Sequence, residues 1–147
     1  AIGETAAIAA DASLRESGIF AALGPHATDT VSAPLWRRIV ATAAELGGLP
    51  VHTHLAQSAE EVRAVSRANN GLSPLGLLHH TGMLGSQLPL MLVHGNYLSG
   101  ADLDLLGEPN QARGTRFRCA RRPRSRRRAR VRGWRGRGRT RAGVNRR

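Results

Sequence analysis

The stretch LPVHTHLAQSAEEV, residues 49–62, joins a short apolar segment to the start of a helix. Residues 49–55 have the length and composition of a buried strand. Ser58 is followed three residues later by Glu61, which is the pattern of an N-terminal capping box, so we expect a helix from there to about residue 68. A strand followed directly by a helix is the unit of parallel α/β folds.

The same alternation continues on both sides of this stretch. Apolar runs predict two further strands, at 19–23 and 88–94. Capping residues and apolar periodicity predict the other helices, at 6–17, 33–46, 74–80 and 99–107. Strands that alternate with helices in this way favour an α/β fold with a parallel sheet, extending over residues 1–110.

Three of the histidines, His26, His54 and His94, lie at the C-terminal ends of the three expected strands. In a parallel sheet or barrel these ends lie on one face, where catalytic groups gather. Imidazole is also a common ligand of catalytic divalent metals. Each histidine taken alone is better interpreted as a packed core or loop residue, and only the three together favour a site. For His52, deeper in its strand, we expect a packing role or a role in supporting the ligands.

Three strings resemble motifs of the amidohydrolase superfamily, in the deaminase and chlorohydrolase branch with S-adenosylhomocysteine and methylthioadenosine deaminases and triazine hydrolases. VHTHLAQSAEEV (51–62) resembles the fifth-strand motif and LMLVHGNYLSGADLDLL (90–106) the sixth-strand motif. ALGPHATDTVS (22–32) is similar to the stretch after the fourth strand. The resemblance implies an internal fragment, a partial (β/α)8 TIM barrel of about three β/α units.

The resemblance also implies roles for the histidines. His54 and His94 would be metal ligands, and His26 would contact the substrate. One divalent ion, Zn²⁺ or Fe²⁺, would activate water to displace ammonia or chloride from an aminated heterocycle or nucleoside. The family's other ligands, a His-x-His pair on the first strand and an Asp on the eighth, lie outside the matched motifs. We therefore expect the isolated chain to be inactive.

Gln57 occupies the catalytic position at which the family commonly has a Glu that shuttles a proton to the substrate ring. An amide can hydrogen-bond a ring nitrogen or an amino group, but it cannot donate and recover a proton. Either adenine-type deamination is in doubt, or another acid, Glu60 or Glu61, takes over the transfer.

Residues 111–147 have a different composition. From 113 onward there are seventeen arginines and no acid, whereas residues 1–112 hold five arginines and ten carboxylates. The formal net charge of +12 therefore comes from this arginine-rich tail. We expect the tail to be disordered and to bind polyanions non-specifically.

Two interpretations of the tail remain open. Runs such as RGWRGRGR (132–139) bind phosphates and stack on bases, which would make the chain an arginine-rich nucleic-acid-binding protein. Alternatively, the tail is a frameshift product, because GC-rich DNA read in a wrong frame yields mostly Arg, Ala, Gly and Pro. We favour the frameshift, since the apolar pattern and every acid are lost at one point.

The sequence favours a cytoplasmic protein that acts on a small molecule. No apolar run reaches the roughly 18 residues of a membrane-spanning helix, and we recognise no secretory leader. Cys119 is the single cysteine, so no disulfide can form within one chain.

Translation of the encoding DNA in its other two frames after codon 110 tests the origin of the tail. We expect a seventh-strand pattern, an apolar run followed by a helix, to reappear in one of them. If neither frame contains one, the nucleic-acid-binding arm becomes the better interpretation.

Overall fold

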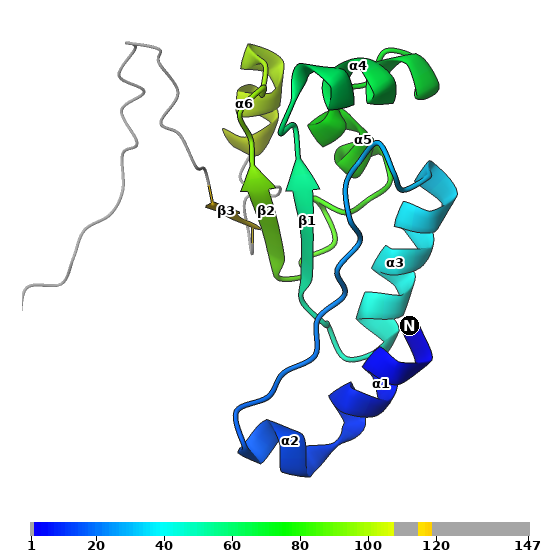
Figure 1. Cartoon of the computed structure of the whole chain (residues 1–147), viewed down its shortest axis with the longest axis vertical. Coiled ribbons are helices and arrows are strands. Elements are labelled where there is room, and N and C mark those ends of the chain that lie inside the picture. The colour runs from blue at the N-terminus through cyan, green and yellow to red at the C-terminus, as the bar shows by residue number, and fades with distance from the viewer. Residues whose placement is uncertain (1, 108–114, 119–147) are drawn as a thin grey trace, which may run out of the picture.

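A parallel sheet forms the centre of the fold (Figure 1). The computed structural model describes residues 2–107 and 115–118. Its strands are β1 (Val51–Leu55), β2 (Leu90–His94) and β3 (Thr115–Arg118), hydrogen-bonded in that order. Both strand pairs are parallel, so the C-terminal ends of the strands lie at one edge of the sheet. The strands predicted at 49–55 and 88–94 are confirmed, each two residues shorter at its start.

A further extended segment pairs with the free side of β1. Parallel bridges join Leu23 to Val51 and Ala27 to His54. The amide of His54 donates to the carbonyl of His26 over 3.0 Å. This segment precedes β1 in the chain and also lies next to it in the sheet, so it acts as a short strand beside β1.

The strand predicted at residues 19–23 is therefore wrong in position. Ile19 and Phe20 are 51% and 72% exposed, and pairing with β1 begins only at Leu23. Apolar character alone suggested the strand, but these side chains have no face to cover in the described structure. The pairing that does form is interrupted at Pro25, because proline has no amide hydrogen to donate to a ladder.

The helices mostly follow the predicted ranges. They are α1 (Ile2–Ala10), α2 (Ala12–Glu16), α3 (Ala33–Glu45), α4 (Ala59–Ala68), α5 (Pro74–His80) and α6 (Gly100–Gly107). From α3 onward they agree with the prediction to within one residue at each end. The helix predicted at 6–17 is wrong as a single helix, because the Asp11 side chain accepts hydrogen bonds from the amides of Ser13 and Leu14 and starts α2.

The core lies on one face of the sheet. Along β1, Val51, Thr53 and Leu55 are buried, while His52 between them is exposed. The buried residues pack against helix side chains that include Trp36 and Leu78. The other face carries His52 and, beside it in register, Met91, which is 41% exposed. Within the described residues, helices thus cover only one side of β1 and β2.

Strand β3 falls in the region predicted to be disordered, so that prediction is wrong for residues 115–118. Backbone pairing with the edge of β2 supplies hydrogen-bond partners that the local composition did not indicate. The remainder of the tail predicted at 111–147 lies outside the described residues. The parallel order is compatible with part of a (β/α)8 barrel, and the barrel itself stays a prediction.

Among the described residues, no helix combines the length and the apolar character required to cross a bilayer.

Substitution of a buried leucine tests this account of the core. Leu78 in α5 is fully buried, so Leu78→Ala should lower the free energy of unfolding by about 2–5 kcal/mol. Leu103→Ala in α6 is the matched control; this side chain is 54% exposed, and its loss should change stability by no more than about 0.5 kcal/mol. Urea denaturation followed by circular dichroism measures both, and equal effects would contradict the assigned core.

Candidate functional site

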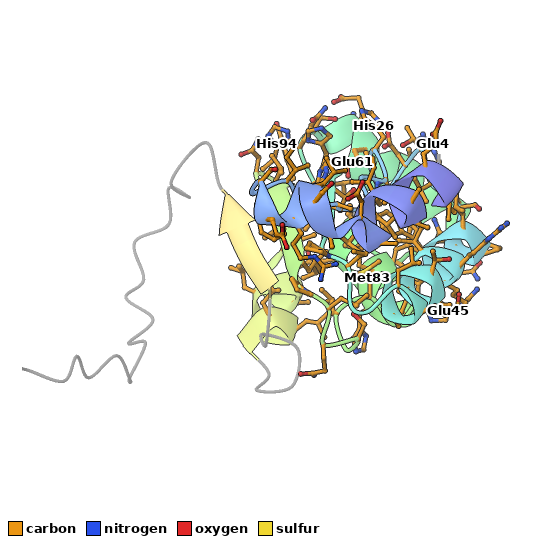
Figure 2. All side chains as sticks on the ribbon, turned by 90° about the horizontal axis from the view of Figure 1, so that it is seen from below. Glu4, His26, Glu45, Glu61, Met83 and His94 are labelled. Carbon is orange, nitrogen blue, oxygen red and sulfur yellow. The ribbon has the colours of Figure 1, made fainter. Side chains whose placement is uncertain are left out.

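Three imidazole rings lie together at the C-terminal edge of the sheet. The centroids of His54 and His94 are 5.1 Å apart and their rings are stacked, with an interplanar angle of 27°. The ring of His26 meets His54 edge-on, with centroids 5.4 Å apart. Figure 2 shows His26 and His94 on the same side of the molecule. The structure thus brings together the three histidines selected from the sequence.

His54 is fixed by its strand. It alternates with the buried residues Thr53 and Leu55 and is only partly exposed. Its Nδ1 atom is buried and has no hydrogen-bond partner among the described residues. Since a buried polar nitrogen without a partner is costly, this atom is suited to receive a ligand.

His94 reaches the same site by a break in its strand. The register pairs His54 with Val93, so regular alternation would place His94 with Leu92, on the opposite face from His54. Instead His94 has φ 83°, a left-handed conformation that is unfavourable for a residue with a side chain. Such outliers cluster at functional sites. Here the turn places the His94 ring against His54.

His26 lies in the extended segment that pairs with β1, one residue before the bridge of Ala27 to His54. Its ring is exposed, and its Nδ1 lies 3.2 Å from the hydroxyl oxygen of Thr30. The same hydroxyl also accepts a hydrogen bond from the amide of Ala27 over 3.2 Å. This contact orients the ring of an exposed side chain.

The pair His54 and His94 has a spacing that suits one divalent ion. Two imidazoles that bind one zinc ion at about 2.0–2.1 Å, at a roughly tetrahedral angle, have ring centres about 5 Å apart. The centroids of His54 and His94 are 5.1 Å apart, close enough for both side chains to reach one ion. Among residues 2–107 and 115–118, however, no group of three or more His, Cys, Asp or Glu side chains could hold a metal ion. A complete catalytic site would need ligands from elsewhere.

Glu61 makes contacts that the sequence pattern did not predict. The Ser58 hydroxyl accepts from the amide of Glu61 over 3.2 Å, which confirms this half of the capping box. The Glu61 carboxylate does not return to Ser58 but accepts from the amides of Ala56, over 3.0 Å, and Gln57, over 2.8 Å. It also accepts from the Thr28 hydroxyl over 2.5 Å. All these contacts are structural, which argues against Glu61 as a proton shuttle.

Glu60 is equally unsuited to replace the family's acid. It is exposed and lies 2.6 Å from the guanidinium of Arg63. The hydrogen bond from its own backbone amide lowers the pKa of Glu60, and the Ser58 hydroxyl and Arg63 lower it further. A carboxyl whose pKa is lowered is a poor proton donor near neutral pH.

Gln57 and His52 each make contacts with neighbouring segments. Gln57 is exposed, and its backbone is held on both sides, since its amide donates to Glu61 and its carbonyl accepts from the Asn96 side chain over 3.3 Å. The ring of His52 lies over Gly24, where an added Cβ would come within 2.9 Å of two ring atoms. This packing contact agrees with the role expected for His52.

Comparison with known proteins supports the resemblance to deaminases. No protein-family model matches the chain. The chain is 34% identical over 90 residues to 5-methylthioadenosine/S-adenosylhomocysteine deaminase from Halothermothrix orenii, which covers 61% of this chain and 20% of that protein. It is 35% identical over 96 residues to 5'-deoxyadenosine deaminase from Methanospirillum hungatei, covering 65% of this chain and 20% of that protein.

A further deaminase gives the same picture. The 5-methylthioadenosine/S-adenosylhomocysteine deaminase from Saccharophagus degradans is 39% identical over 83 residues, covering 56% of this chain and 18% of that protein. The chain thus spans about one fifth of the length of the curated relatives it matches. The resemblance to amidohydrolase-type deaminases that the three motifs indicated is confirmed.

Proton NMR tests the arrangement of the rings. We expect nuclear Overhauser effects between the ring protons of His54 and His94 and between those of His26 and His54, because these rings are in contact. His79, near the end of α5, is the internal control and should show no such effect to His54. Absence of the effect between His54 and His94 would contradict the site.

Proposed function

From this similarity to amidohydrolase-type deaminases, we propose that the chain is part of a metal-dependent hydrolase that removes an amino group from an adenosine-type nucleoside. The contact between His54 and His94 at the ends of neighbouring parallel strands is the observation that carries the proposal. All three of the relatives described above are named as deaminases of adenosine derivatives. Dechlorination of a related heterocycle is the less favoured outcome of the same chemistry.

In this proposal His54 and His94 hold one divalent ion, Zn²⁺ or Fe²⁺. Such an ion, when bound, makes water a better nucleophile near neutral pH and polarises the group that is attacked. The unpartnered Nδ1 of His54 supports its role as a ligand. The spacing of the two rings supports a shared ion, with the remaining ligands supplied by parts of the enzyme outside the described residues.

His26 and Gln57 would bind the substrate. His26 presents an exposed ring held by Thr30, so it can hydrogen-bond a polar group of the nucleoside. The exposed Gln57 amide can donate to, or accept from, a ring nitrogen or an exocyclic amino group. It cannot transfer the proton that the leaving ammonia needs. That proton must come from solvent or from another residue.

Two other expectations stay predictions. The enzyme is expected in the cytoplasm, and the arginine-rich tail is expected to bind polyanions, but nearly all of the tail lies outside the described residues. The nucleic-acid-binding alternative depends on those same residues. We therefore favour the deaminase, which rests on the described part of the chain.

Zinc titration of the isolated chain tests the proposed metal ligands. Isothermal titration calorimetry should detect weak binding of one zinc ion, because two imidazoles form an incomplete site. His54→Ala and His94→Ala should each weaken binding at least about tenfold. His79→Ala removes an exposed histidine of α5 and should leave the affinity unchanged. If the three variants bind zinc equally well, the metal site is not at His54 and His94.

Activity of the isolated chain is a separate measurement. Incubated with zinc and 5'-deoxyadenosine, the 147-residue chain should release no ammonia above a buffer control, because its metal site lacks the family's other ligands. Steady turnover that depends on His54 would show that the site is complete, and would contradict the expected inactivity.

A further inference from the structure

We propose that Glu61 is a positioning residue that joins the loops following the three histidines into one unit. This inference rests on the proposed function, since it assigns a role in arranging that site. Glu61 touches none of the three rings by a hydrogen bond that the structure shows. It acts through the backbone of the loops that follow His26 and His54.

The Glu61 carboxylate joins two of these loops directly. One oxygen accepts from the hydroxyl of Thr28, two residues after His26, and from the amide of Ala56, two residues after His54. The other oxygen accepts from the amide of Gln57. Glu61 is only 4% exposed, so water cannot replace these contacts readily. A single buried side chain on α4 therefore fixes the spacing between the loops.

The loop after β2 is attached to the same point. The amide of Tyr97 donates to the carbonyl of Ala56 over 3.1 Å. The side-chain amide of Asn96 donates to the carbonyl of Gln57 over 3.3 Å. The amides of residues 56 and 57 are thus bound to Glu61, and their carbonyls are bound to the loop that follows His94.

The conformation of Ala56 explains why this support is needed. Ala56 has φ 46°, in the left-handed region that residues with a side chain rarely adopt. Such a conformation persists only where surrounding contacts hold it. The Glu61 carboxylate binds the amides of Ala56 and Gln57, which lie two and three residues after His54 in this turn. Loss of that acceptor should allow the turn to relax and the His54 ring to shift.

The substitution Glu61→Gln tests the hydrogen bonds of the carboxylate separately from the size of the side chain. It keeps the size of the side chain, but one of its two terminal atoms becomes an NH2 group, which cannot accept a hydrogen bond. At least one of the three donors then loses its partner. Glu60→Gln is the matched control, because it makes the same chemical change at the neighbouring, exposed position of α4.

Two NMR measurements on the full chain report the arrangement directly. In Glu61→Gln we expect hydrogen exchange of the Ala56 or Gln57 amide to become at least about tenfold faster. We also expect weaker Overhauser effects between His54 and each neighbouring ring. Zinc affinity should fall at least about tenfold, as when a group that orients a metal ligand is lost. Glu60→Gln should match the wild type in all three.

Thr28 provides a second test in case Glu61→Gln fails to fold. Thr28→Val removes one hydrogen bond at nearly constant volume, and should weaken the effect between His26 and His54 more than that between His54 and His94. Thr28→Ser keeps the hydroxyl, so the Overhauser effect between His26 and His54 should be as strong as in the wild type.

The outcomes separate the two proposals. If Glu61→Gln lowers the melting temperature but leaves ring contacts and amide exchange as in Glu60→Gln, Glu61 is merely structural and the positioning role is overturned. If the wild type binds no zinc, yet Glu61→Gln loosens the ring contacts, the positioning role is supported while the proposed metal site fails.

Discussion

The in-register parallel pairing of β1 and β2 determines where the chemistry of this chain can occur. It sets Leu55 beside His94 and ends both strands at the same edge of the sheet. Val51 and Leu55 of β1 and Leu90 and Leu92 of β2 are buried in the core beneath the helices. This burial holds the register, because a shift by one residue would expose them. His54 and His94 lie at one site because the register of the two strands that carry them is fixed.

Much of this arrangement follows from sequence patterns that are local. The strands around residues 51–55 and 90–94 are short apolar runs between helix signals, and the capping signal at Ser58 marks a helix start where the structure has it. These patterns work because each depends on a few neighbouring residues. They also place each histidine at the end of a strand or extended segment, which is enough to predict that the rings lie on one edge.

What sequence reasoning missed depends on contacts between distant segments. Gly95 is a sign of a tight turn, but it does not indicate that His94 itself has a left-handed φ. Strict alternation along the strand would have placed the His94 ring on the opposite face from His54. The pattern of Ser58 and Glu61 indicated a local cap, whereas the carboxylate reaches Thr28, far away in sequence. The extended segment at 23–27 is defined by its partner β1 more than by its own composition, which explains the misplaced strand.

The resemblance implies an acid at the position of Gln57, and its role there would differ from the role of the buried Glu61. Glu61 uses both oxygens to hold backbone amides and a hydroxyl, so it is unsuited to move protons. A glutamine at 57 preserves the shape of the site and its hydrogen-bonding capacity. Under the proposed function, the chain would keep the hydrogen-bonding groups of the site but not the acid that moves the proton.

The parallel pairing also has a consequence for the order of folding. Each of its strand contacts joins residues separated by whole helices, so forming it closes a long loop and costs chain entropy before the contact can offset that cost. Helices such as α3 and α4 depend on local contacts and can form earlier. The ring cluster is therefore expected to assemble late, so its appearance would mark completion of the native sheet.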